Sequence, residues 1–98
     1  MGQTVQLQAA DGQQVPAYVA QPAGRPRGAV VVLQEIFGVN PHIRAVTDGY
    51  ARDGYLALAP STFQRVQPGV ELGYDEADMK TGMALKAAAE ALPAPGVL

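Results

Sequence analysis

The chain contains no cysteine and only one histidine, His42, among its 98 residues. Without cysteine it can form no disulfide, no thiolate metal site and no nucleophilic thiol. No pair of carboxylates lies at metal-ligand spacing from His42, so the sequence predicts no metal site. The missing side chains therefore exclude several common kinds of catalytic centre.

Long apolar runs and a strong net charge are also missing. No apolar segment approaches the roughly 20 residues that span a bilayer, so no membrane partner is expected. The first residues, Met1–Gln6, lack the basic segment and apolar core of a secretory signal, and a cytoplasmic location is predicted. A net charge of −2 argues against a nucleic-acid partner. With 48% apolar residues, a chain of this length is expected to fold as part of one globular domain.

What the sequence does contain is an unbroken apolar run, Ala29–Leu33, which ends at Gln34 and Glu35. A run this short and this rich in β-branched residues is typical of a strand buried on both faces, and we expect the strand to reach about Gln34. In open α/β sheets, ligands bind beyond the carboxyl ends of the strands. Glu35 is therefore the first residue of the chain that is placed to do chemistry.

Before this run, the sequence predicts an antiparallel hairpin. Apolar and polar residues alternate over Thr4–Gln8 and again over Gln14–Ala20, and Asp11-Gly12 between them is a turn signal. Pro16 has no N–H to donate, which predicts an edge strand or a position early in its strand. A loop rich in proline and glycine, Gln21–Gly28, follows the hairpin.

After the run, a helix and a second apolar strand complete a βαβ unit with a right-handed crossover. Asn40 is a good N-cap, Pro41 fits the first helical position, and Gly54 ends the helix. The strand covers 55–60 and closes at Pro60.

A long loop and a last helix make up the rest of the chain. The loop Ser61–Tyr74 has a length that is often functional. The helix is expected to start at a cap formed by Asp75 or Asp78, and the proline and glycine residues near the C-terminus are expected to end it. Met79 and Met83 lie near its apolar stripe and are expected in the core.

These elements do not make a complete parallel sheet. They leave an outer strand apolar and unpaired, which natural proteins avoid. We therefore expect residues 1–98 to be the N-terminal portion of a single larger α/β domain. The alternative is that a partner chain or a second copy pairs with the open sheet edge and completes the fold.

The run Gln34-Glu35-Ile36-Phe37-Gly38-Val39-Asn40 resembles a motif of the dienelactone hydrolase (carboxymethylenebutenolidase) family. Asp53-Gly54-Tyr55 before the second strand and Ala59-Pro60 at its end agree with the same family. The resemblance covers nearly the whole chain but less than half of a typical family member. It implies the N-terminal part of an α/β-hydrolase fold: a hairpin, a βαβ unit and a further helix on an incomplete sheet.

The resemblance also implies a mechanism, the hydrolysis of lactone or ester bonds by a Cys or Ser nucleophile assisted by Asp and His. The glutamate that matches Glu35 holds or deprotonates the nucleophile, and the backbone N–H that matches Ile36 helps to form the oxyanion hole. The nucleophile and its two partners belong to the missing C-terminal part, and His42 does not match the catalytic histidine. No cofactor is implied. The 98-residue chain alone is expected to be inactive.

Substrate contacts are implied at Phe37 and Lys80. In the family, arginines bind the substrate carboxylate, and one of them falls on Lys80 when the sequences are aligned without gaps from Glu35. A one-residue gap would move the match to Thr81. Lysine keeps the charge but loses the bidentate fork of arginine, which argues against dienelactone itself as the substrate. A small-molecule ester or lactone remains the expected substrate class.

Other interpretations need no catalysis. Glu35 can be a strand-end carboxylate that pairs with an arginine or caps a turn, and Ile36 and Phe37 can pack in the core. Arg65 is expected to be a solvated surface residue. Two non-catalytic functions also fit the sequence: an assembly fragment completed by a partner chain, and a small-ligand-binding module built on the loop Ser61–Tyr74.

Overall fold

The computed structural model describes residues 2–92, which form four strands and two helices. The strands β1 (Gln3–Gln8), β2 (Gln14–Ala20), β3 (Ala29–Val31) and β4 (Leu56–Pro60) make one sheet in the order β1-β2-β4-β3. The helices are α1 (Pro41–Arg52) and α2 (Glu76–Glu90). The predicted order of a hairpin, a βαβ unit and a further helix is confirmed.

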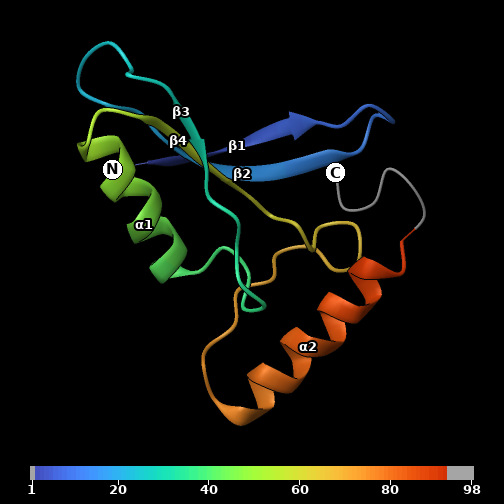
Figure 1. Cartoon of the computed structure of the whole chain (residues 1–98). Coiled ribbons are helices and arrows are strands. Elements are labelled where there is room, and N and C mark those ends of the chain that lie inside the picture. The colour runs from blue at the N-terminus through green and yellow to red at the C-terminus, as the bar shows by residue number, and fades with distance from the viewer. Residues whose placement is uncertain (1, 93–98) are drawn as a thin grey trace.

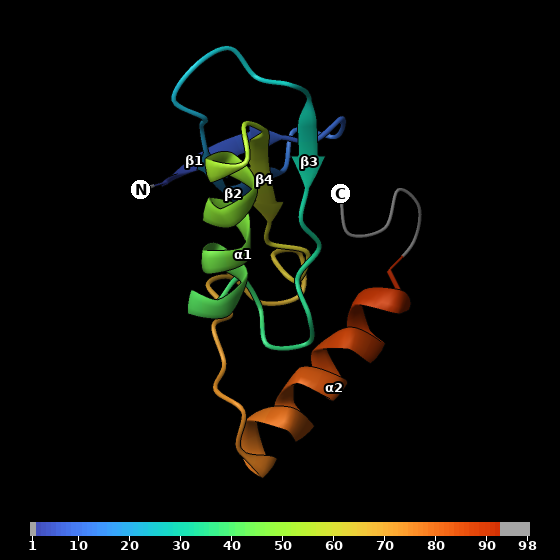
Figure 2. The same cartoon turned by 60° about the vertical axis from the view of Figure 1, so that its left-hand side comes forward.

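The loops after β3 and β4 lie at the carboxyl ends of these two parallel strands, and α2 lies beyond them (Figure 1). Figure 2 shows α1 alongside the sheet, whereas α2 projects away from it. The carboxyl ends of the parallel strands are the position at which α/β sheets bind ligands. The fold therefore directs attention to the loops between the sheet and α2.

β1 and β2 form the predicted antiparallel hairpin over their whole length. β2 also pairs with β4, so it is an interior strand of the sheet. Pro16 fits there because the ladder between β2 and β4 begins one residue later, where Ala17 lies opposite Pro60. The early-strand prediction for Pro16 is confirmed, and the edge-strand alternative is wrong.

The ends of α1 follow the predicted signals. The Asn40 side chain accepts a hydrogen bond from the Ile43 N–H at 3.1 Å, and Pro41 occupies the first turn. Gly54 follows the helix with a φ of 98°, a left-handed conformation that favours glycine. The helix packs on β2 and β4 through its buried side. The buried residues of α1 are Ile43, Thr47 and Ala51.

β3 lies at the edge of the sheet, which corrects the expectation of a strand buried on both faces. Val32 is buried and packs with Ile43 of α1, but Val31 is 56% exposed and Leu33 is 68% exposed. The regular strand ends at Val31, although the Val32 N–H still donates to the Leu58 carbonyl at 2.8 Å. Among residues 2–92, β4 covers one edge of β3, and no strand covers the other.

α2 packs on the loop that precedes it instead of on the sheet. Its residues Leu85 and Ala89 form a buried cluster with Phe63. Met79 is 48% exposed and Met83 is 53% exposed, so the expectation that they lie in the core is wrong. The predicted stop of this helix falls after residue 92, outside the described residues.

Candidate active site

The candidate site is the turn after β3, residues 35–38. The Gly38 N–H donates to the Glu35 carbonyl oxygen at 3.2 Å and closes the turn. Gly38 has a φ of 83°, and a Cβ at this position would overlap the carbonyl group of Val70. Glu35 is exposed, Ile36 is half-buried and Phe37 is buried. The turn thus leaves the Glu35 carboxylate accessible. The buried side chain of Phe37 anchors the turn in the interior.

The side chain of Gln34 bridges the ends of β3 and β4. Its Nε2 donates to the Glu35 carbonyl at 3.0 Å, and its Oε1 accepts from the Thr62 N–H at 2.9 Å. Sequence reasoning missed this contact, although Gln34 stood in the motif that drew attention to Glu35. The sequence offered only a polar residue at the end of an apolar run, and nothing local identified Thr62 as its partner.

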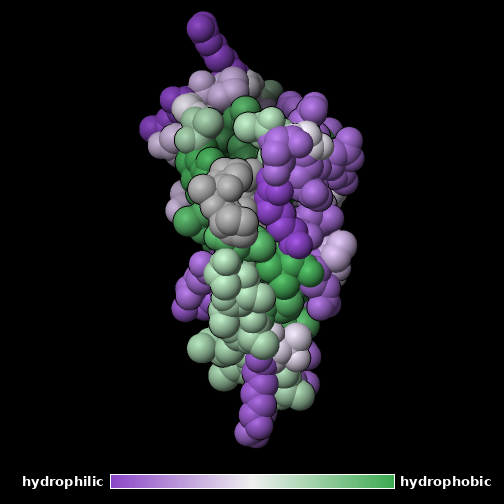
Figure 3. Space-filling model, turned by 90° about the vertical axis from the view of Figure 1, so that its right-hand side faces the viewer, coloured by the Kyte–Doolittle hydropathy of each residue, from purple (hydrophilic) through white to green (hydrophobic). Residues whose placement is uncertain are grey.

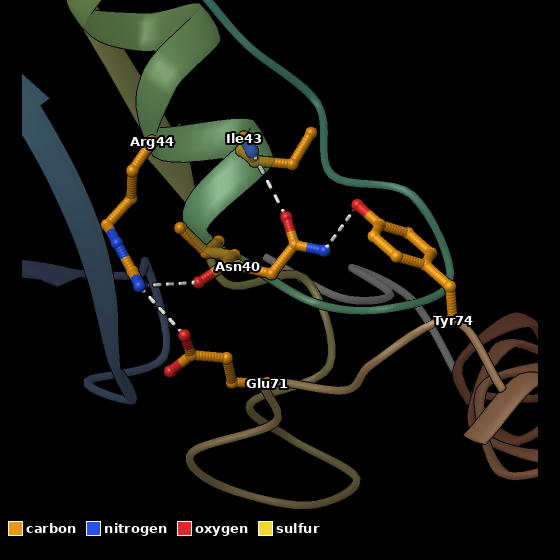
Figure 4. Close-up of polar contacts among 6 residues, drawn as sticks. Asn40, Ile43, Arg44, Glu71 and Tyr74 are labelled. Carbon is orange, nitrogen blue, oxygen red and sulfur yellow. Dashed lines mark hydrogen bonds and ion pairs between the residues drawn. The ribbon is translucent and has the colours of Figure 1, made fainter.

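Residues 72–74 hold the other side of the turn. The Leu72 N–H donates to the Phe37 carbonyl at 2.8 Å. The rings of Phe37 and Tyr74 meet edge to face, with their centroids 4.6 Å apart. The Tyr74 hydroxyl accepts from Nδ2 of Asn40 at 3.0 Å (Figure 4), and Asn40 is only 2% exposed. One buried side chain therefore joins the start of α1 to the residues that support the turn.

Arg44 fastens the same loop to α1 (Figure 4). Its guanidinium donates to the Val39 carbonyl at 2.9 Å and to the Glu71 carboxylate at 2.8 Å. Arg44 is thereby engaged with the loop and not with Glu35. Within residues 2–92, no arginine forms an ion pair with Glu35.

α2 reaches the turn through Gly82. A Cβ at Gly82 would overlap the Ile36 carbonyl oxygen and would come within 3.1 Å of the Ile36 Cβ. Gly82 is buried and lies mid-helix, where glycine costs about 1 kcal/mol relative to alanine. This close approach explains why the helix carries a glycine at this position.

A groove of about 710 Å³ lies between the turn and α2. The surface of the groove is mostly apolar, and Leu33, Phe37 and Phe63 contribute to it together with Glu35 and Ile36. Lys86 and Glu90, paired at 3.1 Å, also line the groove. Figure 3 views the molecule from the right-hand side of Figure 1. Apolar surface lies along the middle of this face. The groove can take apolar groups, and it brings two carboxylates and one ammonium group to its walls.

Lys80 lies outside the residues that line this groove. Its ammonium group is 3.8 Å from Glu76, one turn away on α2, and its side chain is 79% exposed. The Thr81 hydroxyl donates to the Ala77 carbonyl of the same helix at 3.1 Å. A substrate contact at Lys80 therefore stays a prediction, and Lys86 is the lysine that borders the groove in the described structure.

Arg65 corrects another expectation, because it is not a free surface residue. Its guanidinium donates two hydrogen bonds to the Asp11 carboxylate, at 2.8 and 2.9 Å, and its side chain is only 15% exposed. These bonds, with the Gln13 backbone N–H, lower the pKa of Asp11 from 3.8 to about 2. The pair clasps the loop after β4, which carries Phe63, to the hairpin turn.

The structure gives no site role to His42, which is exposed in the first turn of α1. The residues described here contain no cluster of three His, Cys, Asp or Glu side chains that would hold a metal ion. In the same part of the chain, neither helix is long and apolar enough to cross a membrane.

Known proteins match nearly all of this arrangement. The sequence model of the dienelactone hydrolase family matches residues 15–92. A proposed carboxymethylenebutenolidase from Synechocystis sp. is 46% identical over 74 residues, which are 74% of this chain and 30% of that protein. A carboxymethylenebutenolidase from Pseudomonas putida is 37% identical over 68 residues, 69% of this chain and 29% of that protein.

Solved structures agree. A proposed dienelactone hydrolase from Klebsiella pneumoniae has a TM-score of 0.72 and 30% identity, covering 99% of this chain and 38% of that chain. The four-stranded sheet and two helices therefore correspond to part of an α/β-hydrolase fold. The chain spans about a third of the length of the relatives that it matches.

Proposed function

The chain belongs to the dienelactone hydrolase family, and we propose that the protein hydrolyses ester or lactone bonds of small molecules by nucleophilic catalysis. The observation that carries this proposal is the turn after β3, which exposes the Glu35 carboxylate beside the backbone amide of Ile36. Within residues 2–92, the Ile36 N–H donates to no protein acceptor, which supports a role as a donor to substrate.

In the proposed reaction, a Cys or Ser nucleophile attacks the carbonyl carbon of the substrate. The carbonyl oxygen becomes an oxyanion, which the Ile36 N–H stabilises. When the oxyanion collapses, the alcohol part leaves, and water then releases the acid part from the nucleophile. A fixed amide aimed at the developing charge lowers the barrier, and removing one such donor typically slows hydrolysis about 100- to 1,000-fold.

Glu35 is proposed to hold or deprotonate the nucleophile. It cannot complete a catalytic centre by itself, because the chain has no cysteine and its one histidine lies in the first turn of α1. We propose that the nucleophile, an aspartate and a histidine come from the part of the hydrolase domain that the relatives have and this chain does not span. The isolated 98-residue chain should then be inactive.

Two further residues are proposed to contact the substrate. Phe37 lines the groove and offers an apolar wall for the acyl or lactone part. Lys80 carries the charge that a substrate carboxylate would need, although it lies outside the groove lining. Its role requires the substrate or the rest of the domain to extend along α2.

The test is the hydrolysis of p-nitrophenyl acetate by the full-length protein and by its Glu35→Gln variant. We expect kcat/KM to fall about 100-fold, within the usual range for loss of a group that assists proton transfer. Asp53→Asn at the far end of α1 is the matched control, because it removes the same charge at an exposed position. Equal activity of the Glu35→Gln variant and the control would contradict the proposal.

A second candidate function is an assembly fragment that a partner chain or a second copy completes. The open edge of β3 favours it, because Val31 and Leu33 are more than half exposed there. The mass of the 98-residue chain in solution tests this candidate. A monodisperse monomer would exclude completion by a second copy.

A further inference from the structure

We infer that Gln34 is a positioning residue for the oxyanion-hole amide of Ile36. Gln34 is not expected to touch the substrate. It acts by fixing the peptide group that joins Glu35 to Ile36. The catalytic consequence of this inference rests on the proposed function, whereas the orientation of the peptide group does not.

The Glu35 carbonyl oxygen receives two hydrogen bonds. Nε2 of Gln34 donates to it at 3.0 Å and the Gly38 N–H at 3.2 Å. A trans peptide is planar, so the N–H of the next residue points opposite to this carbonyl. The two donors that hold the Glu35 carbonyl therefore also set the direction of the Ile36 N–H.

The other end of the Gln34 side chain is anchored to a different strand connection. Its Oε1 accepts from the Thr62 N–H at 2.9 Å, just after β4. An N–H can only donate, so Oε1 must face Thr62 and Nε2 must face the Glu35 carbonyl. β3 and β4 pair in parallel, which makes Gln34 a brace between the carboxyl ends of neighbouring strands.

The peptide group on the other side of Ile36 is held as well. Its carbonyl lies against Gly82 of α2, where even a methyl group would not fit. Ile36 thus has one neighbouring peptide group fixed by hydrogen bonds and the other fixed by packing. Such rigidity is what a preorganised hydrogen-bond donor requires.

The variant that tests the inference is Gln34→Met in the full-length protein, because methionine keeps the length of the side chain and loses both hydrogen bonds. The matched control is Gln13→Met. Nε2 of Gln13 also donates to the carbonyl of the following residue, Gln14, at 3.2 Å, but in the hairpin turn. Both variants lose the same kind of local bond, and only one loses it at the site.

Two readouts are required. In proton–nitrogen NMR spectra, Gln34→Met should shift the Ile36 amide resonance, and Gln13→Met should leave it in place. In p-nitrophenyl acetate hydrolysis, Gln34→Met should lower kcat about 10- to 100-fold with KM and the pH profile little changed, as expected for a misdirected transition-state donor. An unmoved Ile36 resonance, or an unchanged kcat of Gln34→Met when Glu35→Gln does lower hydrolysis, would overturn the inference.

A second variant covers the case in which Gln34→Met does not fold. Gln34→Glu keeps an acceptor for the Thr62 N–H and loses the donor to Glu35, and it should shift the Ile36 resonance in the same way.

The positioning role of Gln34 and the proposed hydrolase function are contradicted by different results. If both Gln34→Met and Glu35→Gln leave hydrolysis unchanged while the Ile36 resonance moves, the positioning stands and the proposed function is wrong.

Discussion

Gly82 of α2 and Ile36 of the turn after β3 meet backbone to backbone. The contact leaves no room for a Cβ on Gly82, because that atom would overlap the Ile36 carbonyl oxygen. α2 makes little contact with the sheet, so this approach and the cluster around Phe63 are what connect it to the candidate site. A glycine that weakens the helix locally is thus what lets the helix support the site.

The first prediction is that Gly82→Ala lowers stability. Alanine favours the helix by about 1 kcal/mol, but the overlap with a backbone carbonyl costs about 1–3 kcal/mol. We expect a net loss of up to about 2 kcal/mol in the free energy of unfolding, measured by urea titration. Gly49→Ala in α1 is the control, because the nearest atom to its Cβ would be 4.0 Å away. The control should gain about 0.5–1 kcal/mol, and a similar gain for Gly82→Ala would contradict the contact.

The second prediction concerns the ion pair of Asp11 and Arg65. Folding lowers the pKa of Asp11 from 3.8 to about 2. The stabilisation is therefore fully present above pH 3.8 and is lost as the pH falls toward 2. The difference in urea midpoint between the wild type and Asp11→Asn should shrink over this interval. In an Arg65→Met background it should be small at every pH, and a pH-dependent difference that persists there would show that another group is responsible.

The third prediction compares the two ends of the hydrogen bond between Asn40 and Tyr74. Asn40→Ala removes the cap of α1 as well as this bond, and should cost about 1–2 kcal/mol or more. Tyr74→Phe keeps the ring against Phe37 and removes only the acceptor of Nδ2, which should cost about 1 kcal/mol. Thermal unfolding of both variants measures the order. A larger loss for Tyr74→Phe would mean that the cap is not the main role of Asn40.

The fourth prediction concerns the open edge of β3. Leu33 is 68% exposed beside an edge that no strand covers within residues 2–92. The isolated 98-residue chain should therefore self-associate, and Leu33→Lys should shift it toward the monomer in sedimentation velocity. Leu7→Lys on β1, where the leucine is 38% exposed, serves as a comparison at the opposite edge. A chain that stays monomeric at all concentrations would contradict this expectation.

Local signals in the sequence were enough to predict the elements. Asn40, Pro41 and Gly54 marked the two ends of α1, and alternation marked the hairpin, because these signals act over a few neighbouring residues. The sequence predicted that Asp75 or Asp78 caps α2, and Asp75 is the residue that does so. This signal is also a local one. The family motif then identified the turn at Glu35.

The sequence could not predict what depends on distant contacts. β3 looked buried on both faces because its residues are apolar, but burial depends on which strands and helices cover it. The prediction that Met79 and Met83 lie in the core was wrong for the same reason, because the side of α2 that packs on Phe63 is the one that carries Leu85. Gln34 and Thr62 lie 28 positions apart, and no local pattern announces a bond between them.

The central claim is that the Ile36 N–H forms part of an oxyanion hole. The most direct measurement is a crystal structure of the full-length protein with its nucleophile covalently bound to an organophosphonate, whose phosphoryl oxygen stands in for the oxyanion. We predict that this oxygen lies about 2.7–3.1 Å from the Ile36 nitrogen. A phosphoryl oxygen bound by other donors, with the Ile36 N–H directed away from it, would contradict the account.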